Sequence, residues 1–251
     1  MAARVTYGIQ SVRKALARGG VERLFLQEGL GPERLGRLSE AIAGSGVPVA
    51  YVAAAELQQL TGTTKHQGVA AFVQSRGALS EREAQSFLDA VELPVVLVLD
   101  GIADPRNFGA LLRTADAAGV DLVVTGRSRN VGVTPVVSKV ACGAAEAQPI
   151  AEVGNIARFL GHLADRGLRI VGTDDAAAVS LYEVDLAVPL ALVVGAEGEG
   201  MRRLTREHCD MLVRLPMRGV VESLNVAVAA GICLYECVRQ RSHLAPPGAL
   251  R

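Results

Sequence analysis

The chain has 251 residues, enough for two compact domains or one large one. Half of its residues are hydrophobic and 21% are charged, and its apolar runs are too short to cross a bilayer, so we expect a cytoplasmic, globular protein without a membrane segment. The 26 basic and 26 acidic residues cancel, so net charge gives no evidence for a nucleic acid partner. The four cysteines form no CxxC pair of the kind found in redox or zinc sites.

Residues 1–75 have the pattern of a small α/β unit. We expect helices over 7–18, 32–43 and 56–60, and strands over 21–27, 47–52 and 69–73. Eight Lys and Arg residues in this unit stand against five Asp and Glu residues, an excess of three that is a weak sign of a nucleic acid partner. Residues 76–92 are charged and poor in apolar side chains, so we place a linker there.

From residue 93 onward the pattern changes to apolar strands that alternate with helices, and we expect one domain over 93–245. The expected strands are 93–99, 121–125, 168–173, 190–195 and 211–215, and the expected helices are 107–118, 134–145, 155–166, 204–209 and 226–238. Strands this continuously apolar are typical of a sheet covered on both faces. The alternation therefore predicts a parallel sheet with helices on both sides.

The polar loop 216–222 lies between the last strand and the long C-terminal helix. Ser223 is expected to be the N-cap of that helix, because its hydroxyl can accept a bond from a first-turn amide. The helix is rich in alanine and other small or apolar residues, so we expect it to pack on more than one side. A polar loop between a buried strand and a buried helix is where α/β proteins usually hold a ligand.

A second polar stretch, 104–113, directly follows the first apolar strand. Asp104 and Pro105 are helix-start signals, Asn107 lies at the mouth of the helix, and Arg113 lies about one and a half turns further on. An arginine in so apolar a helix needs a partner. Asp116, three residues later, is a purely structural candidate, and a bound ligand is a functional one.

A third stretch, 194–201, has three glycines that let the backbone approach a ligand closely. Their order is not the GxGxxG of dinucleotide sites, and there is no GKS or GKT phosphate loop. Its two glutamates, Glu197 and Glu199, are either solvated or functional. The four histidines are scattered without metal-ligand spacing, so we expect no metal site.

Together these stretches resemble a known family. Residues 104–113, 195–201 and 215–227 are similar to motifs one, two and three of the SpoU/TrmH branch of the SPOUT RNA methyltransferases, and the likeness covers 93–241. The runs 139–146 and 195–209 most resemble members that methylate a guanosine ribose in the peptidyl-transferase P loop of 23S rRNA. The first seventy residues resemble the small substrate-binding domain of that family, which is similar in fold to ribosomal protein L30.

The resemblance implies a fold and a reaction. The catalytic domain is expected to be a parallel sheet with its C-terminal segment threaded as a trefoil knot, a rare arrangement that periodicity cannot reveal. S-adenosyl-L-methionine would bind bent in the knot, mostly through backbone groups, and supply the methyl for a ribose 2′-hydroxyl. The substrate would be 23S rRNA or an assembling large ribosomal subunit. A homodimer through helix 226–238 is also implied, with an active site completed across it.

The resemblance also assigns residues. The catalytic positions are Arg113, Asn107, Glu197, Ser223 and Asn225, and the cofactor contacts are Thr173, Gly195, Leu215 and Leu224. Because a guanidinium stays protonated, we expect Arg113 to orient the hydroxyl and stabilise negative charge, while an RNA phosphate or solvent takes the proton. Residues 220–222 are Val, Val and Glu, where homologues often have small residues.

Other functions remain open at this stage. The same reaction on a tRNA ribose is the nearest alternative, although a separate N-terminal domain favours rRNA. A catalytically silent rRNA-binding or ribosome-assembly factor is a second, and the intact polar set argues against it. A nucleotide-binding dehydrogenase is disfavoured by the order of the glycines.

Overall fold

The computed structural model describes 3–18, 21–74, 77–128, 130–221 and 223–242. These residues divide into two compact units. The first comprises Met1–Gly77 and Val133–Ala147, and the second comprises Ala78–Gly132 and Gln148–Arg251.

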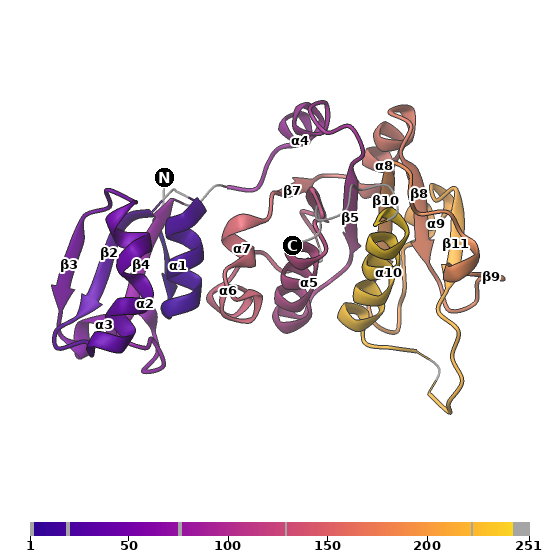
Figure 1. The fold of residues 1–251 in the computed structure, drawn as a ribbon. Coiled ribbons are helices and arrows are strands. Elements are labelled where there is room, and N and C mark those ends of the chain that lie inside the picture. The colour runs from indigo at the N-terminus through magenta and orange to yellow at the C-terminus, as the bar shows by residue number, and fades with distance from the viewer. Residues whose placement is uncertain (1–2, 19–20, 75–76, 129, 222, 243–251) are drawn as a thin grey trace. The chain divides into compact units, whose positions relative to one another are not determined.

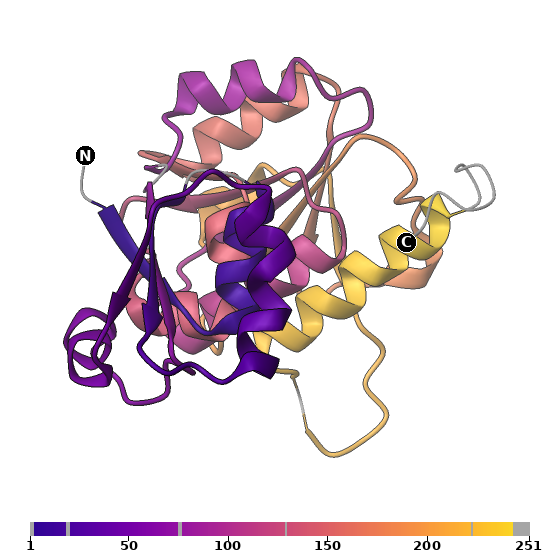
Figure 2. The ribbon, with the colours of Figure 1, turned by 60° about the vertical axis from the view of Figure 1, so that its left-hand side comes forward.

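The first unit is built on a four-stranded sheet in the order β1-β4-β2-β3 (Figure 1). Its elements are β1 (Ala3–Tyr7), α1 (Ile9–Arg18), β2 (Val21–Gln27), α2 (Pro32–Ala43), β3 (Val49–Val52), α3 (Ala54–Thr61), β4 (Val69–Gln74), α6 (Pro135–Ala141) and α7 (Ala144–Ala147). Strand β4 is antiparallel to β1 and β2, whereas β2 and β3 are parallel. Successive strand residues point to opposite faces, so Leu24 packs with α1 and α2 while Phe25 packs with α3. Helices α1 and α2 lie side by side (Figure 2).

Two expectations for this unit were incomplete. The first helix begins at Ile9 rather than at residue 7, because Tyr7 still pairs with Ala70 in the sheet. Gly8, with a φ of 88°, makes the turn between the strand and the helix. The expected helix 134–145 is divided into α6 and α7, since Cys142 adopts a left-handed conformation with φ 52°. In the structure this segment groups with the first unit.

The second unit contains a seven-stranded sheet in the order β7-β6-β5-β10-β8-β11-β9. Its strands are β5 (Val95–Asp100), β6 (Leu122–Gly126), β7 (Ile150–Val153), β8 (Arg169–Thr173), β9 (Val179–Ser180), β10 (Leu190–Gly195) and β11 (Met211–Arg214). All neighbouring strands are parallel. The predicted parallel sheet is therefore confirmed.

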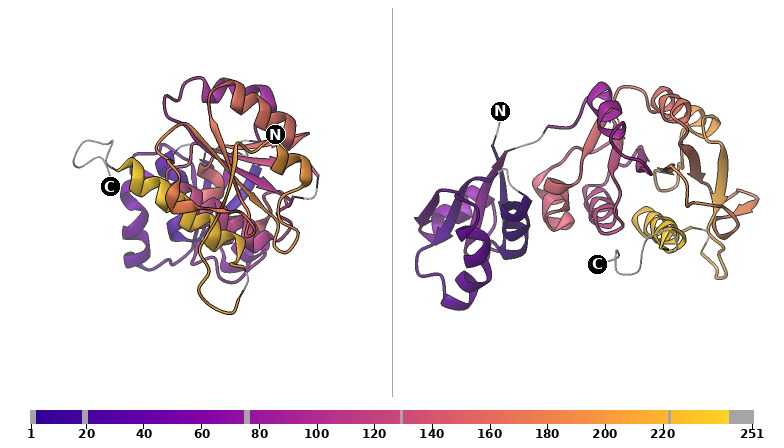
Figure 3. Two further views of the ribbon diagram at one scale, coloured as in Figure 1. Left: turned by 90° about the vertical axis from the view of Figure 1, so that its right-hand side faces the viewer. Right: turned by 45° about the horizontal axis from the view of Figure 1, so that its top comes forward.

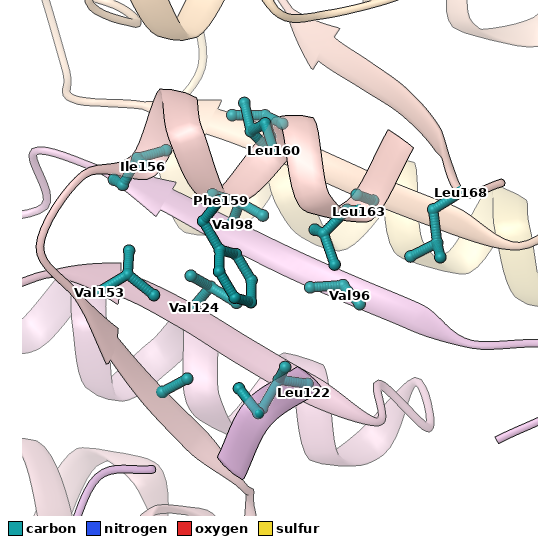
Figure 4. Close-up of a cluster of buried hydrophobic side chains, with 14 of the residues drawn as sticks. Val96, Val98, Leu122, Val124, Val153, Ile156, Phe159, Leu160, Leu163 and Leu168 are labelled. Carbon is teal, nitrogen blue, oxygen red and sulfur yellow. The ribbon is translucent and has the colours of Figure 1, made fainter. Parts of the chain in front are cut away.

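Helices cover both faces of this sheet (Figures 1 and 3). They are α4 (Glu81–Leu88), α5 (Pro105–Ala117), α8 (Ile156–Asp165), the short 3-10 helix η1 (Leu181–Glu183), α9 (Arg203–Glu207) and α10 (Val226–Arg241). On one face, Phe159 and Leu163 of α8 pack over Val96 and Val98 of β5 and Val124 of β6 (Figure 4). Helix α10 lies against α5 and β10.

The stretch 76–92, where a linker is expected, contains a helix. This helix, α4, buries Ala84 and Leu88 in the core of the second unit. Glu81 accepts the backbone N–H of Gly154 and ion-pairs with Arg158 of α8. Burial raises the pKa of Glu81, but these hydrogen bonds outweigh it and hold the pKa below its usual range. The capping box formed by Ser80 and Glu83 is a helix-start signal that is visible in the sequence.

In the described part of the chain, every helix is too short or too polar to span a membrane.

Candidate active site

Four neighbouring strands of the second unit end along one edge of the sheet. Gly195 at the end of β10 pairs in register with Asp100 of β5, and Thr173 at the end of β8 pairs with Val213 of β11. Leu215 directly follows β11. Carboxyl ends of parallel strands are where open α/β sheets bind ligands. Three of the four expected cofactor contacts (Thr173, Gly195 and Leu215) thus lie at this edge, and Leu224 lies half-buried just before α10.

The chain forms a tight hairpin from Gly195, the last residue of β10, through Gly198 and Gly200. Ala196 and Gly200 exchange two backbone hydrogen bonds of 3.1 and 2.9 Å, and Gly198 and Gly200 have φ of 79° and 67°. A Cβ on Gly195 would lie 2.1 Å from the carbonyl carbon of Gly200, which leaves no room for any side chain. The hairpin presents Glu197 at its exposed tip.

Three of the expected catalytic residues meet beside this hairpin. The Nδ2 amide of Asn225 donates to Oε1 of Glu197 at 2.6 Å and to Oδ1 of Asn107 at 2.9 Å. The same Glu197 oxygen accepts the backbone N–H of Val226 at 3.2 Å. Side chains from the start of α5, the hairpin and the start of α10 are thereby joined in one polar network.

Asn225, and not Ser223, is the N-cap of α10. Its Oδ1 accepts the N–H of Ala227 at 3.0 Å, and the helix begins at Val226. The carboxylate of Glu197 lies at the same helix end, where a negative charge is favoured by the helix dipole. The expectation for Ser223 was wrong: both residues are good caps by type, and the helix begins two residues later than expected from Ser223. Ser223 itself is exposed.

Arg113 lies on α5, six residues after Asn107, and its side chain is exposed. The two helices that carry the network pack closely. A Cβ added to Gly231 of α10 would lie 3.5 Å from the methyl of Thr114, the residue after Arg113. The packing of small residues keeps the start of α10 beside the motif that contains Asn107 and Arg113.

The loop that follows β11 offers backbone groups to a ligand. None of the described residues 216–221 and 223–224 makes a backbone–backbone hydrogen bond with another described residue. Residues 216, 218–221 and 223 are exposed, so backbone groups of this loop are accessible to solvent and to a ligand. Such a donor and acceptor set fits S-adenosyl-L-methionine held mostly by the main chain.

Metal and thiol chemistry find no support in the described residues. Among them, no group of three or more His, Cys, Asp or Glu side chains is placed to hold a metal ion. Burial raises the pKa of the Cys209 and Cys233 thiols to about 12, so neither is a thiolate nucleophile at neutral pH.

One charged pair at this site was not among the residues expected from the sequence. Asp100 ends β5 with a fully buried side chain, and it contacts both the backbone and the guanidinium of Arg202. In the sequence, the only sign of this pair is an aspartate at the end of an otherwise apolar strand. Its partner lies 102 residues away and is found only in the folded chain.

Comparison with known proteins identifies the family. Residues 94–235 match the SpoU rRNA Methylase family, and residues 5–77 match the RNA 2′-O ribose methyltransferase substrate binding family. The 23S rRNA (guanosine-2′-O-)-methyltransferase RlmB of Shewanella oneidensis is 46% identical over 240 residues, which cover 94% of this chain and 97% of that protein.

Solved structures agree with this assignment. A crystal structure of an RNA 2′-O ribose methyltransferase is 28% identical with a TM-score of 0.75, covering 96% of this chain and 89% of that one. The SpoU methyltransferase AviRb from Streptomyces viridochromogenes, solved with AdoMet, has a TM-score of 0.79 over 96% of this chain and 91% of its own, and at 24% identity it supports the fold alone. The resemblance seen in the sequence is confirmed: the chain belongs to the SpoU rRNA methylase family.

Proposed function

We propose that this chain transfers a methyl group from S-adenosyl-L-methionine to the 2′-hydroxyl of a guanosine in 23S rRNA, in the peptidyl-transferase P loop. The observation that carries the proposal is the network of Asn107, Glu197 and Asn225 beside the carboxyl ends of β8, β10 and β11. The name and the 46% identity of the Shewanella relative support 23S rRNA as the substrate. The site of action is then the cytoplasm, where the large ribosomal subunit assembles.

S-adenosyl-L-methionine supplies a methyl carbon activated by a positively charged sulfur. The ribose 2′-oxygen forms the new bond to this carbon as the carbon–sulfur bond breaks, and the hydroxyl proton leaves to an RNA phosphate or to solvent. Arg113 orients the hydroxyl and stabilises its developing negative charge, because a guanidinium is a donor that does not itself accept the proton. Thr173, Gly195, Leu215 and Leu224 hold the cofactor.

The remaining polar residues position the reacting groups. Glu197 accepts two N–H groups at the start of α10 and so fixes the amide of Asn225, which in turn fixes Asn107. Ser223, exposed two residues before the helix cap, is left to contact the ribose. Hydrogen bonds among charged and neutral groups of this kind set orientation, which contributes strongly to the rate of a two-substrate reaction.

Replacing Asn225 tests this network. Asn225→Asp keeps an oxygen that can cap α10 but removes the amide donor shared by Glu197 and Asn107. It also sets a second carboxylate beside Glu197, whose Oε1 lies 2.6 Å from Nδ2 of Asn225 in the wild-type chain. We expect the rate of methyl transfer to fall on the order of 10²-fold. Asn225→Ala loses the cap as well, which costs about 1 kcal/mol of stability. Single-turnover rates and urea midpoints of the two variants separate these effects, and an Asn225→Asp variant with wild-type turnover would refute the positioning role.

The first unit is the proposed RNA-binding part. Arg23 on β2 and Lys65 in the loop before β4 are exposed, and the segment has a small basic excess. Changing both to alanine in the full chain should weaken binding to a 23S rRNA fragment. It should also reduce the slope of log affinity against log salt by roughly 0.7 to 0.9 for each lost phosphate contact. Arg82→Ala, an exposed arginine on α4, is the control, and equal slopes in all three proteins would contradict the assignment.

We also propose a homodimer through α10 and a trefoil-knotted C-terminal segment. Val228 and Tyr235 of α10 are each 52% exposed in the single chain, so the helix has an apolar surface left to bury. The chain order supports the knot, because β11 lies near the far edge of the sheet and the chain then returns to α5 and β10. Sedimentation of the wild-type chain and of Tyr235→Glu tests the dimer.

The reaction is tested with purified full-length protein and transcripts of 23S rRNA and tRNA. Methyl transfer to 23S rRNA that stops when the target guanosine is 2′-deoxy supports the proposal. Transfer to tRNA alone would support the same reaction but show that the substrate is tRNA and not 23S rRNA. Binding to 23S rRNA without any transfer would identify an RNA-binding or assembly factor instead.

A further inference from the structure

The carboxylate of Glu197 stands on a short hairpin that has little of its own to hold it in place. Its internal cross-links are the two backbone hydrogen bonds between Ala196 and Gly200, and residues 197–200 are exposed. Even a full two-stranded hairpin is at best marginally stable in water. The position of Glu197, and with it the bonds it accepts from α10, must therefore be set by whatever holds the base of the hairpin.

Asp100 holds that base. It is the last residue of β5, its side chain is 0% exposed, and it lies in register with Gly195. Its Oδ2 accepts the backbone N–H of Arg202 at 2.9 Å. Its Oδ1 lies 3.1 Å from Nε of Arg202 as an ion pair without the geometry of a hydrogen bond. A buried carboxylate is costly unless it is paired, so this contact fixes the residue that follows the hairpin.

The same segment is tied at a second point. Arg206 of α9 ion-pairs with Asp174, which follows Thr173 at the end of β8. Strand β10 lies between β5 and β8, so its last residue, Gly195, lies between the strand ends that carry Asp100 and Asp174. Each of these carboxylates pairs with an arginine of the segment after the hairpin. Of the two pairs, only the one with Arg202 adjoins the hairpin directly.

We propose that Asp100 and Arg202 are positioning residues for methyl transfer. Their pairing sets the hairpin so that Glu197 meets Asn225, and neither residue contacts the reacting groups. This inference rests on the proposed function of the site. Breaking the pair should lower kcat through Glu197, while KM for RNA changes little, because the RNA-binding unit is untouched.

The variants can be matched closely. Arg202→Met keeps the backbone N–H and much of the side-chain volume but removes the guanidinium, and Arg202→Lys keeps the charge. Arg203→Ala is the control, because Arg203 is the next residue and its side chain is 76% exposed. Among the described residues, its ion-pair partner is Glu207 of the same helix, α9. For each protein we would measure kcat and KM on a 23S rRNA transcript and amide hydrogen exchange of residues 195–201.

The expected results separate positioning from general stability. Arg202→Met should lower kcat about tenfold or more and speed hairpin exchange, Arg202→Lys should recover most of both, and Arg203→Ala should match wild type. In a Glu197→Gln background, Arg202→Met should lower kcat by less than about twofold further, because both changes remove one function. The proposal would be overturned if the losses of kcat from Arg202→Met and Glu197→Gln multiplied in the double variant. It would also be overturned if amide exchange of residues 195–201 did not change in Arg202→Met.

Two further outcomes are distinguishable. If Arg202→Met does not fold, Arg202→Lys alone and in the Glu197→Gln background gives the same test of additivity. If the wild-type chain does not methylate 23S rRNA, the proposed function fails. Hairpin exchange in the same variants then still decides whether Arg202 holds residues 195–201.

Discussion

Replacing Arg113 by alanine is expected to lower methyl transfer by at least about 10²-fold, the usual cost of removing one donor that stabilises developing negative charge. Binding of S-adenosyl-L-methionine should stay within a few-fold of wild type, because the expected cofactor contacts lie at the strand ends and in the loop before α10, while Arg113 lies on α5. Transfer of a tritiated methyl group to 23S rRNA measures the first quantity, and calorimetric titration measures the second.

Arg113→Lys is the sharper variant, because an ammonium keeps the charge but loses the planar fork of a guanidinium. A large loss in this variant too would show that geometry matters as well as charge. Arg82→Ala on α4, exposed and remote in sequence from every strand end of the site, should leave turnover unchanged. Wild-type turnover of Arg113→Ala would remove Arg113 from the mechanism.

The second large effect is expected from Gly195→Ala. The added Cβ would lie 2.1 Å from the carbonyl carbon of Gly200 and 2.2 Å from the nitrogen of Met201, and both atoms are backbone. The hairpin must therefore move away from the end of β10. We expect a loss of stability of about 1–3 kcal/mol from overpacking, together with loss of cofactor affinity and of methyl transfer.

Gly161→Ala is the matched control for this substitution. Gly161 lies within α8, and a Cβ there meets nothing within 4 Å. Alanine in a helix interior is favoured over glycine, so this variant should gain up to about 1 kcal/mol and keep full activity. Urea unfolding, cofactor titration and turnover check both variants. A Gly195→Ala protein that binds cofactor as tightly as wild type would contradict the account of the hairpin.

Much of the site could be predicted because strand ends are visible in the sequence. Asn107 and Glu197 each follow an apolar strand, and parallel strands end at one edge of a sheet, so their convergence follows from the fold class. The motif resemblance added Asn225 to them. The structure brings these three residues together by hydrogen bonds, whereas their catalytic roles stay predictions until measured.

The rest depends on contacts that local patterns do not contain. Ser223 and Asn225 are equally good helix caps by residue type, and only in the folded chain is Asn225 found to cap the helix, with Glu197 accepting the next amide. The pairing of Asp100 with Arg202 joins the end of β5 to the start of α9, two segments that lie far apart in the sequence. Helix α4 is short and rich in charge, and its capping box of Ser80 and Glu83 is the sequence signal that marks it.

A map of ribose methylation in rRNA and tRNA, from cells with and without this protein, tests the central claim most directly. We expect one 2′-O-methylguanosine to disappear from the P loop of 23S rRNA, with all other positions unchanged. The Arg113→Ala protein should fail to restore it. An unchanged map, or the loss of a tRNA position in its place, would contradict the proposed activity on 23S rRNA.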